Sequence, residues 1–278
     1  MEAVLAQKER IRSPVGAGMF YPEDKKETLK FIRAFGLNEG SGGQAQAIIA
    51  PHGAWGFSGE LAARAFSAAM GRSGSINRVV ILGPIHDKRE KGIFLSNSYS
   101  FHTPLGNILV DQDITEELEL CGSFFEIDDI PHLGEHSIEI LLPFVKYCFP
   151  QASIVPILMG QPTAEYIYDL AKTLKTVITP VLDETLLVVS CNLSCGKDLT
   201  STRLLAEECL RLFTEKDAAS LEAAILDGRL NACGGGLVAS LLGSGLLDGK
   251  HSCSAAEDLV SAVGVENNTV FYSALSFE

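Results

Sequence analysis

The sequence is poor in positive charge, and it contains no long apolar run. Its 22 Lys and Arg residues stand against 35 Asp and Glu residues, which gives a formal net charge of −13 with no long basic run. This balance argues against nucleic acid or an anionic membrane surface as a partner. No apolar stretch approaches the ~20 residues that span a bilayer, since the best candidate, residues 237–247, is short and broken by glycines. Residues 1–12 are charged and lack the apolar stretch of a signal peptide.

Disulfide bonds are not expected either. The 7 cysteines of this 278-residue chain are an odd number and spread widely, and a chain of this length does not need them to stabilise a core. Hydrophobic residues make up 46% and charged residues 21% of the chain, so it can bury a sizeable core and is not disordered. We therefore expect a globular protein of the cytoplasm.

Short apolar runs alternate with longer helical patterns from about residue 47 onward. Buried strands are predicted at residues 47–50, 78–82 and 185–189, because these runs are almost wholly apolar. Helices are predicted at residues 60–70, 164–178, 201–213, 218–226 and 236–246. Continuous apolar strands separated by helices indicate a sheet that is covered on both faces. With no linker long enough to divide the chain, we expect one α/β domain over residues 1–278, with three layers (α/β/α) and a central, largely parallel or mixed sheet.

Three further segments complete the predicted order of elements. Residues 135–149 carry apolar residues on one face and acidic residues in the first turn, which predicts a helix with Glu139 solvated near its start. Residues 153–158 are strand-like, and Pro156 either weakens this strand or places it at a sheet edge. Residues 269–275 predict a closing strand.

Polar side chains follow three of the predicted strands, where open α/β sheets bind ligands. His52 follows the first of these strands, His86 the second, and Asn192 with Cys195 the third. A single histidine in a loop is more often a surface or structural group, so spacing alone leaves both interpretations open.

Two further residues carry candidate chemistry. His136 opens the predicted helix 135–149, where backbone N–H groups favour anionic partners. Cys233 precedes three glycines and a predicted helix, so it is either a thiolate favoured by the helix dipole or an inert cysteine in a turn.

Short motifs along the chain then narrow these alternatives. They are residues 15–22 (VGAGMFYP), 48–52 (IIAPH), 81–86 (ILGPIH), 103–106 (TPLG), 135–139 (EHSIE), 155–160 (VPILMG), 190–194 (SCNLS) and 232–234 (ACG). In this order they resemble the Memo-like family, whose fold is similar to that of the class III extradiol dioxygenases that use non-haem iron. The resemblance covers nearly the whole chain.

The resemblance implies a metal pocket formed by His52, His86 and Cys233. Imidazole nitrogens and a thiolate suit one transition-metal ion, iron, copper or zinc, whereas magnesium and calcium prefer oxygen ligands. The similarity to the dioxygenases would imply a metal held by two histidines and one carboxylate. A cysteine as the third ligand does not fit an ordinary dioxygenase mechanism. Asp87 and Glu135 are the nearby candidates for a carboxylate.

The chain also departs from the family pattern that it resembles. Asn192 and Cys195 stand where the family usually has Asp and, three residues later, His. Asparagine is no base, and a thiol is a poorer proton shuttle than imidazole near neutral pH. The family's Pro-His-Ala-Gly-aromatic run reads Pro-His-Gly-Ala-Trp at residues 51–55.

Three functions remain in competition. The first is a metal-dependent redox enzyme in which His136, Cys195 and the Asn192 position serve the catalytic site. The second is a non-catalytic module that binds a peptide or small anion in the same cleft, with Trp55 either lining the cleft or packed in the core. The third is a thiol hydrolase with Cys233 as nucleophile and His52 or His136 as base. The family association also points to a radical-SAM protein as a pathway partner, and the substrate stays unassigned.

Overall fold

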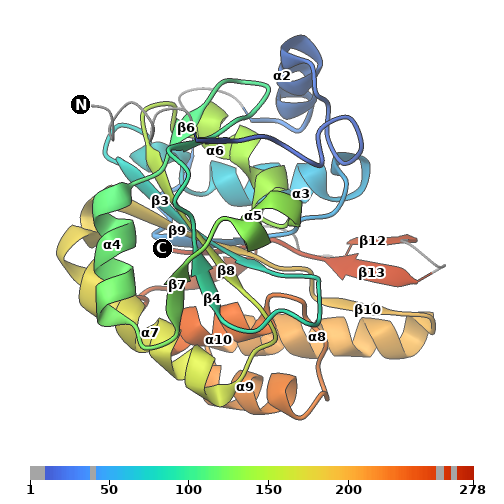
Figure 1. The fold of residues 1–278 in the computed structure, drawn as a ribbon. Coiled ribbons are helices and arrows are strands. Elements are labelled where there is room, and N and C mark those ends of the chain that lie inside the picture. The colour runs from blue at the N-terminus through green and yellow to red at the C-terminus, as the bar shows by residue number, and fades with distance from the viewer. Residues whose placement is uncertain (1–9, 38–41, 255–259, 264–267) are drawn as a thin grey trace.

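The protein is described by a computed structural model over residues 10–37, 42–254, 260–263 and 268–278. Its centre is a mixed sheet in the order β11-β14-β2-β9-β3-β8-β4-β7 (Figure 1). The four middle strands are mutually parallel: β2 (Ala47–Ala50), β9 (Thr185–Ser190), β3 (Arg78–Pro84) and β8 (Ser153–Met159). β4 (Ile93–Leu95) runs antiparallel to β8, and β7 (Phe125–Ile127) is parallel to β4. On the other side, β14 (Leu275–Phe277) is antiparallel to β2, and β11 (Ser252–Ser254) is antiparallel to β14.

Helices cover both faces of this sheet. One face packs against α2 (Lys25–Ala34), α3 (Trp55–Ser67) and α6 (Leu142–Cys148), and the other against α4 (Gln112–Cys121), α7 (Ala164–Ile178), α8 (Leu199–Glu215), α9 (Ala218–Leu226) and α10 (Gly235–Gly243). Along β3, Val79 and Ile81 belong to the first core, while Val80 and Leu82 belong to the second. Successive strand residues point to opposite faces, so an unbroken apolar run buries both. The predicted three-layer α/β fold with a largely parallel, mixed sheet is confirmed.

Smaller elements lie around the sheet. A second sheet joins β1 (Ile11–Arg12), β5 (Ser100–Phe101) and β6 (Ile108–Leu109), and a third joins β10 (Ser194–Gly196), β13 (Thr269–Tyr272) and β12 (Val260–Val263). The remaining elements are α5 (Ile130–Gly134) and three 3-10 helices, η1 (Met70–Arg72), η2 (Glu139–Leu141) and η3 (Thr179–Glu184). Within the described ranges, no helix combines the length and apolar character needed to cross a membrane.

The predicted helix over residues 135–149 is confirmed only in its second half. The segment continues from α5 through an extended residue, Glu135, and a 3-10 turn, and α6 begins only at Leu142. Pro143 is in the first turn of α6, the one helical position where its missing N–H costs nothing. Glu139 is also buried rather than solvated, with 2% of its surface exposed, because it pairs with Arg12.

Two strand predictions also need correction. β8 is an interior strand despite Pro156, because β4 pairs only with residues 157–159 and leaves the proline without a partner from β4. The predicted strand 269–275 is two strands, β13 and β14, which pair into different sheets.

Candidate metal centre

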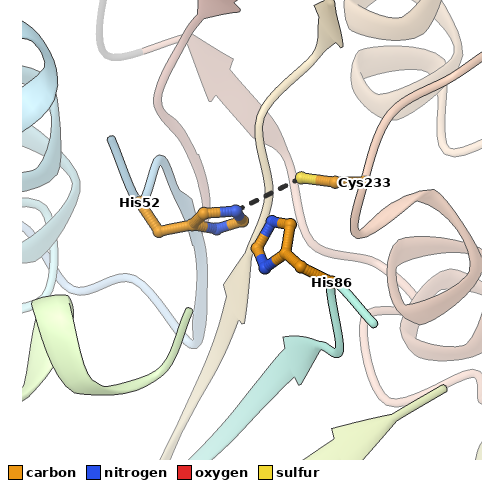
Figure 2. Close-up of side chains that lie close together, drawn as sticks. All are labelled: His52, His86 and Cys233. Atoms are coloured by element: carbon orange, nitrogen blue, oxygen red, sulfur yellow. Dashed lines mark hydrogen bonds between the residues drawn. The ribbon is translucent and has the colours of Figure 1, made fainter. Parts of the chain in front are cut away.

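Three adjacent parallel strands bring the candidate ligands together at their carboxyl ends. His52 lies just beyond β2 and His86 just beyond β3, with β9 between the two strands. Cys233 comes from the turn before α10, and the backbone N–H of Asn192, just beyond β9, donates a hydrogen bond to its Sγ over 3.2 Å. Figure 2 shows the two imidazole rings and the thiol converging on one point.

The three side chains are close enough to share one ion. One ligand atom each from His52, His86 and Cys233 lies within 4.8 Å of the others. Nε2 of His52 is 3.3 Å from Sγ of Cys233, and the two imidazole rings meet edge-to-face with centroids 5.2 Å apart. His52 is buried, whereas Cys233 is half-buried and His86 exposed, so the group opens on one side.

A serine hydroxyl fixes the tautomer of His52. Ser190 Oγ donates to the carbonyl oxygen of Ser137 over 2.7 Å, so it must accept a hydrogen bond from the Nδ1–H of His52, 2.5 Å away. The lone pair of that imidazole is then on Nε2, the nitrogen that faces Cys233. Ligating histidines in metalloproteins are typically oriented by such a contact on their other nitrogen.

A carboxylate does the same for His86. Nδ1 of His86 is 3.0 Å from Glu135 Oε1, and Glu135 also accepts the backbone N–H groups of His86, His136 and Ser137. Burial raises the pKa of Glu135, but the hydrogen bonds and charge of His86 outweigh it and hold the pKa at about 2. Glu135 therefore stays ionised and keeps a proton on Nδ1. Asp87, the other candidate carboxylate, pairs instead with Arg89.

The thiol of Cys233 is acidic in this setting. A hydrogen bond with the Cys191 thiol lowers the pKa of Cys233 well below its usual range, and the rings of His52 and His86 lower it further against the effect of burial. Burial lowers the pKa of His86, yet its hydrogen bonds to Cys233 and Glu135 raise it to about 10. Both shifts favour a thiolate on Cys233 beside a protonated His86.

His136 also lies at the carboxyl ends of these strands, but it is held by ring stacking. Its ring stacks between Phe20 and His86, with centroid distances of 4.6 and 4.8 Å. Burial lowers the pKa of His136 to about 4, despite the carboxylate of Glu135, so the ring is neutral at physiological pH. With His86 and Glu135 it forms a second group that could hold a metal. Because Glu135 already accepts three backbone N–H groups, this group serves better as a hydrogen-bonded support for His86.

Asn192 and Cys195 lie beside this centre without forming part of it. The Asn192 side-chain oxygen accepts the backbone N–H of His52 over 3.0 Å, so Asn192 positions a ligand rather than moving protons. Cys195 is exposed, and its backbone pairs with the side chain of Asn231. Although Cys195 is exposed, partial desolvation of its thiol and the neighbouring Cys233 raise the pKa of Cys195, which favours a neutral thiol at physiological pH.

A cavity of about 620 Å³ opens onto the candidate ligands. Its described lining consists of Phe20, His52, Gly53, Ala54, Phe57, His86, His136, Asn192, Ser194, Cys195, Asn231, Cys233, Asn268, Val270 and Tyr272. None of these lining residues is Lys, Arg, Asp or Glu. The described part of the lining therefore offers a small anion no lysine or arginine. Trp55 does not line it: the ring is 2% exposed, packs on Phe144, and donates its N–H to the carbonyl of Ile140.

Sequence reasoning missed three residues of this site. Ser190 and Phe20 lie within the recognised motifs, but only the folded chain shows what each contacts. Tyr272 comes from the predicted closing strand, with no motif to single it out.

Comparison with known proteins agrees with the arrangement of motifs. The sequence model described as "Memo-like protein" matches residues 12–257. A MEMO1 family protein of Thermotoga neapolitana is 30% identical over 247 residues, covering 84% of this chain and 88% of the relative. Another, from Thermotoga petrophila, is 28% identical over 277 residues, covering 94% and 99%.

Among solved structures, an uncharacterised protein of Escherichia coli K12 aligns with a TM-score of 0.45 and 11% identity over 82% of this chain and 98% of that one. The family match itself spans most of the described residues, including all of those that form the candidate metal centre. On this ground, the chain belongs to the Memo-like family.

Proposed function

We propose that the protein binds one transition-metal ion through Nε2 of His52, Nε2 of His86 and Sγ of Cys233, and that it acts as a metal-dependent redox protein. The observation that carries the proposal is the clustering of these ligand atoms within 4.8 Å, with Nδ1 of each histidine engaged by a separate partner. Histidines that merely pack in a core have no need of this double arrangement.

The donor set fits the ion that is proposed. Two imidazole nitrogens and one thiolate are the ligands that iron, copper(I) and zinc accept, whereas magnesium and calcium need oxygen. Three protein ligands would leave a coordination position open, and all three side chains line the cavity, which would give a bound molecule access to the ion. A bound iron or copper ion would supply redox chemistry at this position.

The residues around the three ligands orient them or exchange protons with a bound molecule. Ser190 and Glu135 hold the proton on Nδ1 of His52 and His86, so that the lone pair of each Nε2 would be available to an ion. His136, neutral and in the cavity wall, is the group able to accept a proton from a molecule bound there. Asn192 fixes the backbone of His52, and the neutral thiol of Cys195 has no role as a base near neutral pH.

Metal analysis tests this proposal directly. Protein purified anaerobically and loaded with Fe(II), Cu(I) or Zn(II) in turn should retain close to one ion per chain for at least one metal. The double variant His52→Ala/Cys233→Ala should lose it. The matched control is His102→Ala/Cys121→Ala, which removes an exposed histidine and an exposed cysteine elsewhere. A wild-type protein that retains none of the three metals would rule out the proposed function.

A binding module is the second candidate, favoured by Asn192 and Cys195, which supply no base beside the cavity. In this function, a peptide or neutral small molecule occupies the cavity whether or not a metal is present. Binding should then survive chelation and the His86→Ala substitution. Loss of all binding on chelation would leave only the metal-dependent function.

The contact between Cys233 and His52 also permits a thiol hydrolase. A nucleophilic Cys233 should react with iodoacetamide much faster than the other cysteines, and zinc loading should not protect it. Protection by one equivalent of zinc instead supports Cys233 as a metal ligand. Peptide mapping after partial alkylation distinguishes the two outcomes.

A further inference from the structure

Tyr272 places a hydroxyl group without a partner beside the candidate metal centre. It is the last residue of β13 and lines the cavity, yet only 5% of its surface is exposed. Within the part of the chain that the structure describes, its hydroxyl has no protein hydrogen-bond partner. The side chain is thus buried while its hydroxyl opens onto the cavity, so the hydroxyl is available to a molecule that enters the cavity.

Gly53 makes room for this hydroxyl. A Cβ atom on Gly53 would lie 2.8 Å from Oη, 2.9 Å from Cζ and 3.0 Å from Cε1 of Tyr272. These separations are shorter than ordinary van der Waals contact, and the ring belongs to a residue on a paired strand. Any residue larger than glycine at position 53 would therefore displace the ring of Tyr272 from its place in the cavity.

The other polar groups of the described lining are largely engaged. Asn231 uses both ends of its amide on the backbone of Cys195, and Ser194 donates to the carbonyl of Thr202. The oxygen of Asn192 accepts from His52, which leaves its NH₂ group for a ligand.

The remaining wall is mainly apolar. It is formed by Phe20, Ala54, Phe57 and Val270 together with the amide of Asn268, and no Lys, Arg, Asp or Glu is among the described lining residues. The ionisable side chains His52, His86 and Cys233 of the described lining contact one another. A charged ligand would therefore lose its hydration without meeting an unpaired counter-charge among the described lining residues. The cavity therefore favours an uncharged molecule with a large apolar part.

We propose that the cavity binds an uncharged, mainly apolar molecule, and that the Tyr272 hydroxyl, in the space left by Gly53, donates a hydrogen bond to an oxygen atom of that molecule. The inference rests on the proposed function in one respect: this molecule is the one that would be presented to the metal. Burial raises the pKa of Tyr272, so the hydroxyl keeps the proton that it donates.

Three probes of one shape test the proposal: 2-naphthamide, 2-naphthoate and 2-isopropenylnaphthalene. They present a neutral hydrogen-bonding group, an anion and an apolar group, respectively, on the same ring system. Equilibrium dialysis against metal-depleted protein, in which no ion can ligate the carboxylate, should give tightest binding for the amide, at least about tenfold tighter than for the carboxylate. Equal or tighter binding of 2-naphthoate, or no saturable binding of the amide, would overturn the assigned ligand class.

Tyr272→Phe removes only the hydroxyl. It should weaken 2-naphthamide binding about fivefold, as expected for one hydrogen bond, and leave 2-isopropenylnaphthalene unchanged. The control is Tyr168→Phe, at a tyrosine that is 70% exposed on α7. If Tyr272→Phe weakens both probes equally or neither, the hydroxyl has no such role.

Gly53→Ala tests the space that the hydroxyl occupies. It should weaken 2-naphthamide binding and lower the Tm, and the loss of Tm should vanish in a Tyr272→Ala background. Gly56→Ala is the control, because a Cβ at Gly56 meets nothing within 4 Å. An unchanged Tm and unchanged amide binding in Gly53→Ala would contradict the proposed fit.

Metal content separates this inference from the proposed function. If the wild type binds no metal but discriminates among the probes through Tyr272, the metal function fails and the inference holds. If one metal ion is retained and Tyr272→Phe changes neither metal content nor probe binding, the metal function holds and the inference fails.

Discussion

At the scale of single residues, the hydroxyl of Ser190 decides which nitrogen of His52 is available. It donates to the carbonyl of Ser137 and accepts from Nδ1, which places the lone pair on Nε2. Without the hydroxyl, Nδ1 loses its acceptor, and the imidazole is free to change tautomer or rotate. The geometry of the candidate metal centre therefore depends on a residue that does not contact the ion.

Ser190→Ala should weaken metal binding about 10- to 100-fold, the usual effect of removing a group that orients a ligand. Competition with a chromophoric chelator measures the affinity. Ser244→Ala is the matched control, since Ser244 is also buried and donates only to the carbonyl of Leu241. An unchanged affinity in Ser190→Ala would show that His52 keeps its orientation through other contacts.

The sequence predicts the candidate ligands but not the groups that orient them. His52 and His86 follow apolar strands, and Cys233 follows from the motif resemblance. Ser190 reaches His52 across 138 positions of the chain, and Glu135 reaches His86 across 49. Such pairs form only once the chain has folded and remote segments have become neighbours. Local sequence patterns do not predict which segments these are.

At the scale of elements, one buried carboxylate ties the N-terminal segment to the sheet. Glu139 in η2 pairs with Arg12 of β1, and it also accepts the N–H groups of Val15 and Gly16 and the hydroxyl of Tyr21. Arg12 also donates to the carbonyls of His132 and Glu135, on either side of the end of α5. The N-terminal segment, which carries Phe20 to its place against His136, is held by this network.

Glu139→Gln should lower the free energy of unfolding by about 3–5 kcal/mol, because it leaves the buried guanidinium of Arg12 without a counter-charge. Urea denaturation measures the loss. Glu60→Gln breaks the exposed pair with Arg64 and should cost less than about 1 kcal/mol. Similar losses in the two variants would mean that the buried pair contributes no more than an ordinary surface contact.

Helix boundaries were predictable where the signals are local. The predicted helices 164–178 and 218–226 coincide with α7 and α9, and Thr163 and Asp217 accept N–H groups at their first turns. The predicted helix 135–149 begins too early, because Pro143 marks the first turn of α6 and because Arg12, the partner of Glu139, is 127 positions away. Burial of a charged residue cannot be seen in the sequence when its counter-charge is this remote.

At the scale of the whole molecule, the alternation of apolar runs and helical patterns was sufficient to predict the layered α/β fold. It was not sufficient for the order of the strands or for the separate sheet of β10, β12 and β13. That sheet carries Cys195 and Tyr272 to the cavity. The strand order depends on how the connections cross the sheet, so the cavity wall was the least predictable part of the site.

The stability of the whole chain should depend on pH through His132. This ring is 2% exposed, and its Nε2 donates to the carbonyl of Phe94. Burial lowers the pKa of His132 to about 4, the charge of Arg12 acting in the same direction, while the bond to Phe94 and the charge of Asp129 oppose it only in part. In the unfolded chain, His132 has an ordinary histidine pKa of about 6.5. Between about pH 6.5 and about pH 4, His132 is therefore protonated in the unfolded chain but neutral in the folded chain.

Stability is therefore lost as the pH falls through this window, by about 2–3 kcal/mol for His132 alone. His132→Gln retains a donor for Phe94 but cannot titrate, so its free energy of unfolding should fall less between neutral pH and about pH 5 than that of the wild type. His102→Gln, at an exposed histidine, should follow the wild-type curve. The pKa of His136 is lowered as well, but His136 is present in all three proteins, so its contribution cancels from the comparison. Urea denaturation across this range measures the slopes, and parallel curves for wild type and His132→Gln would show that His132 becomes protonated as readily in the folded chain as in the unfolded one.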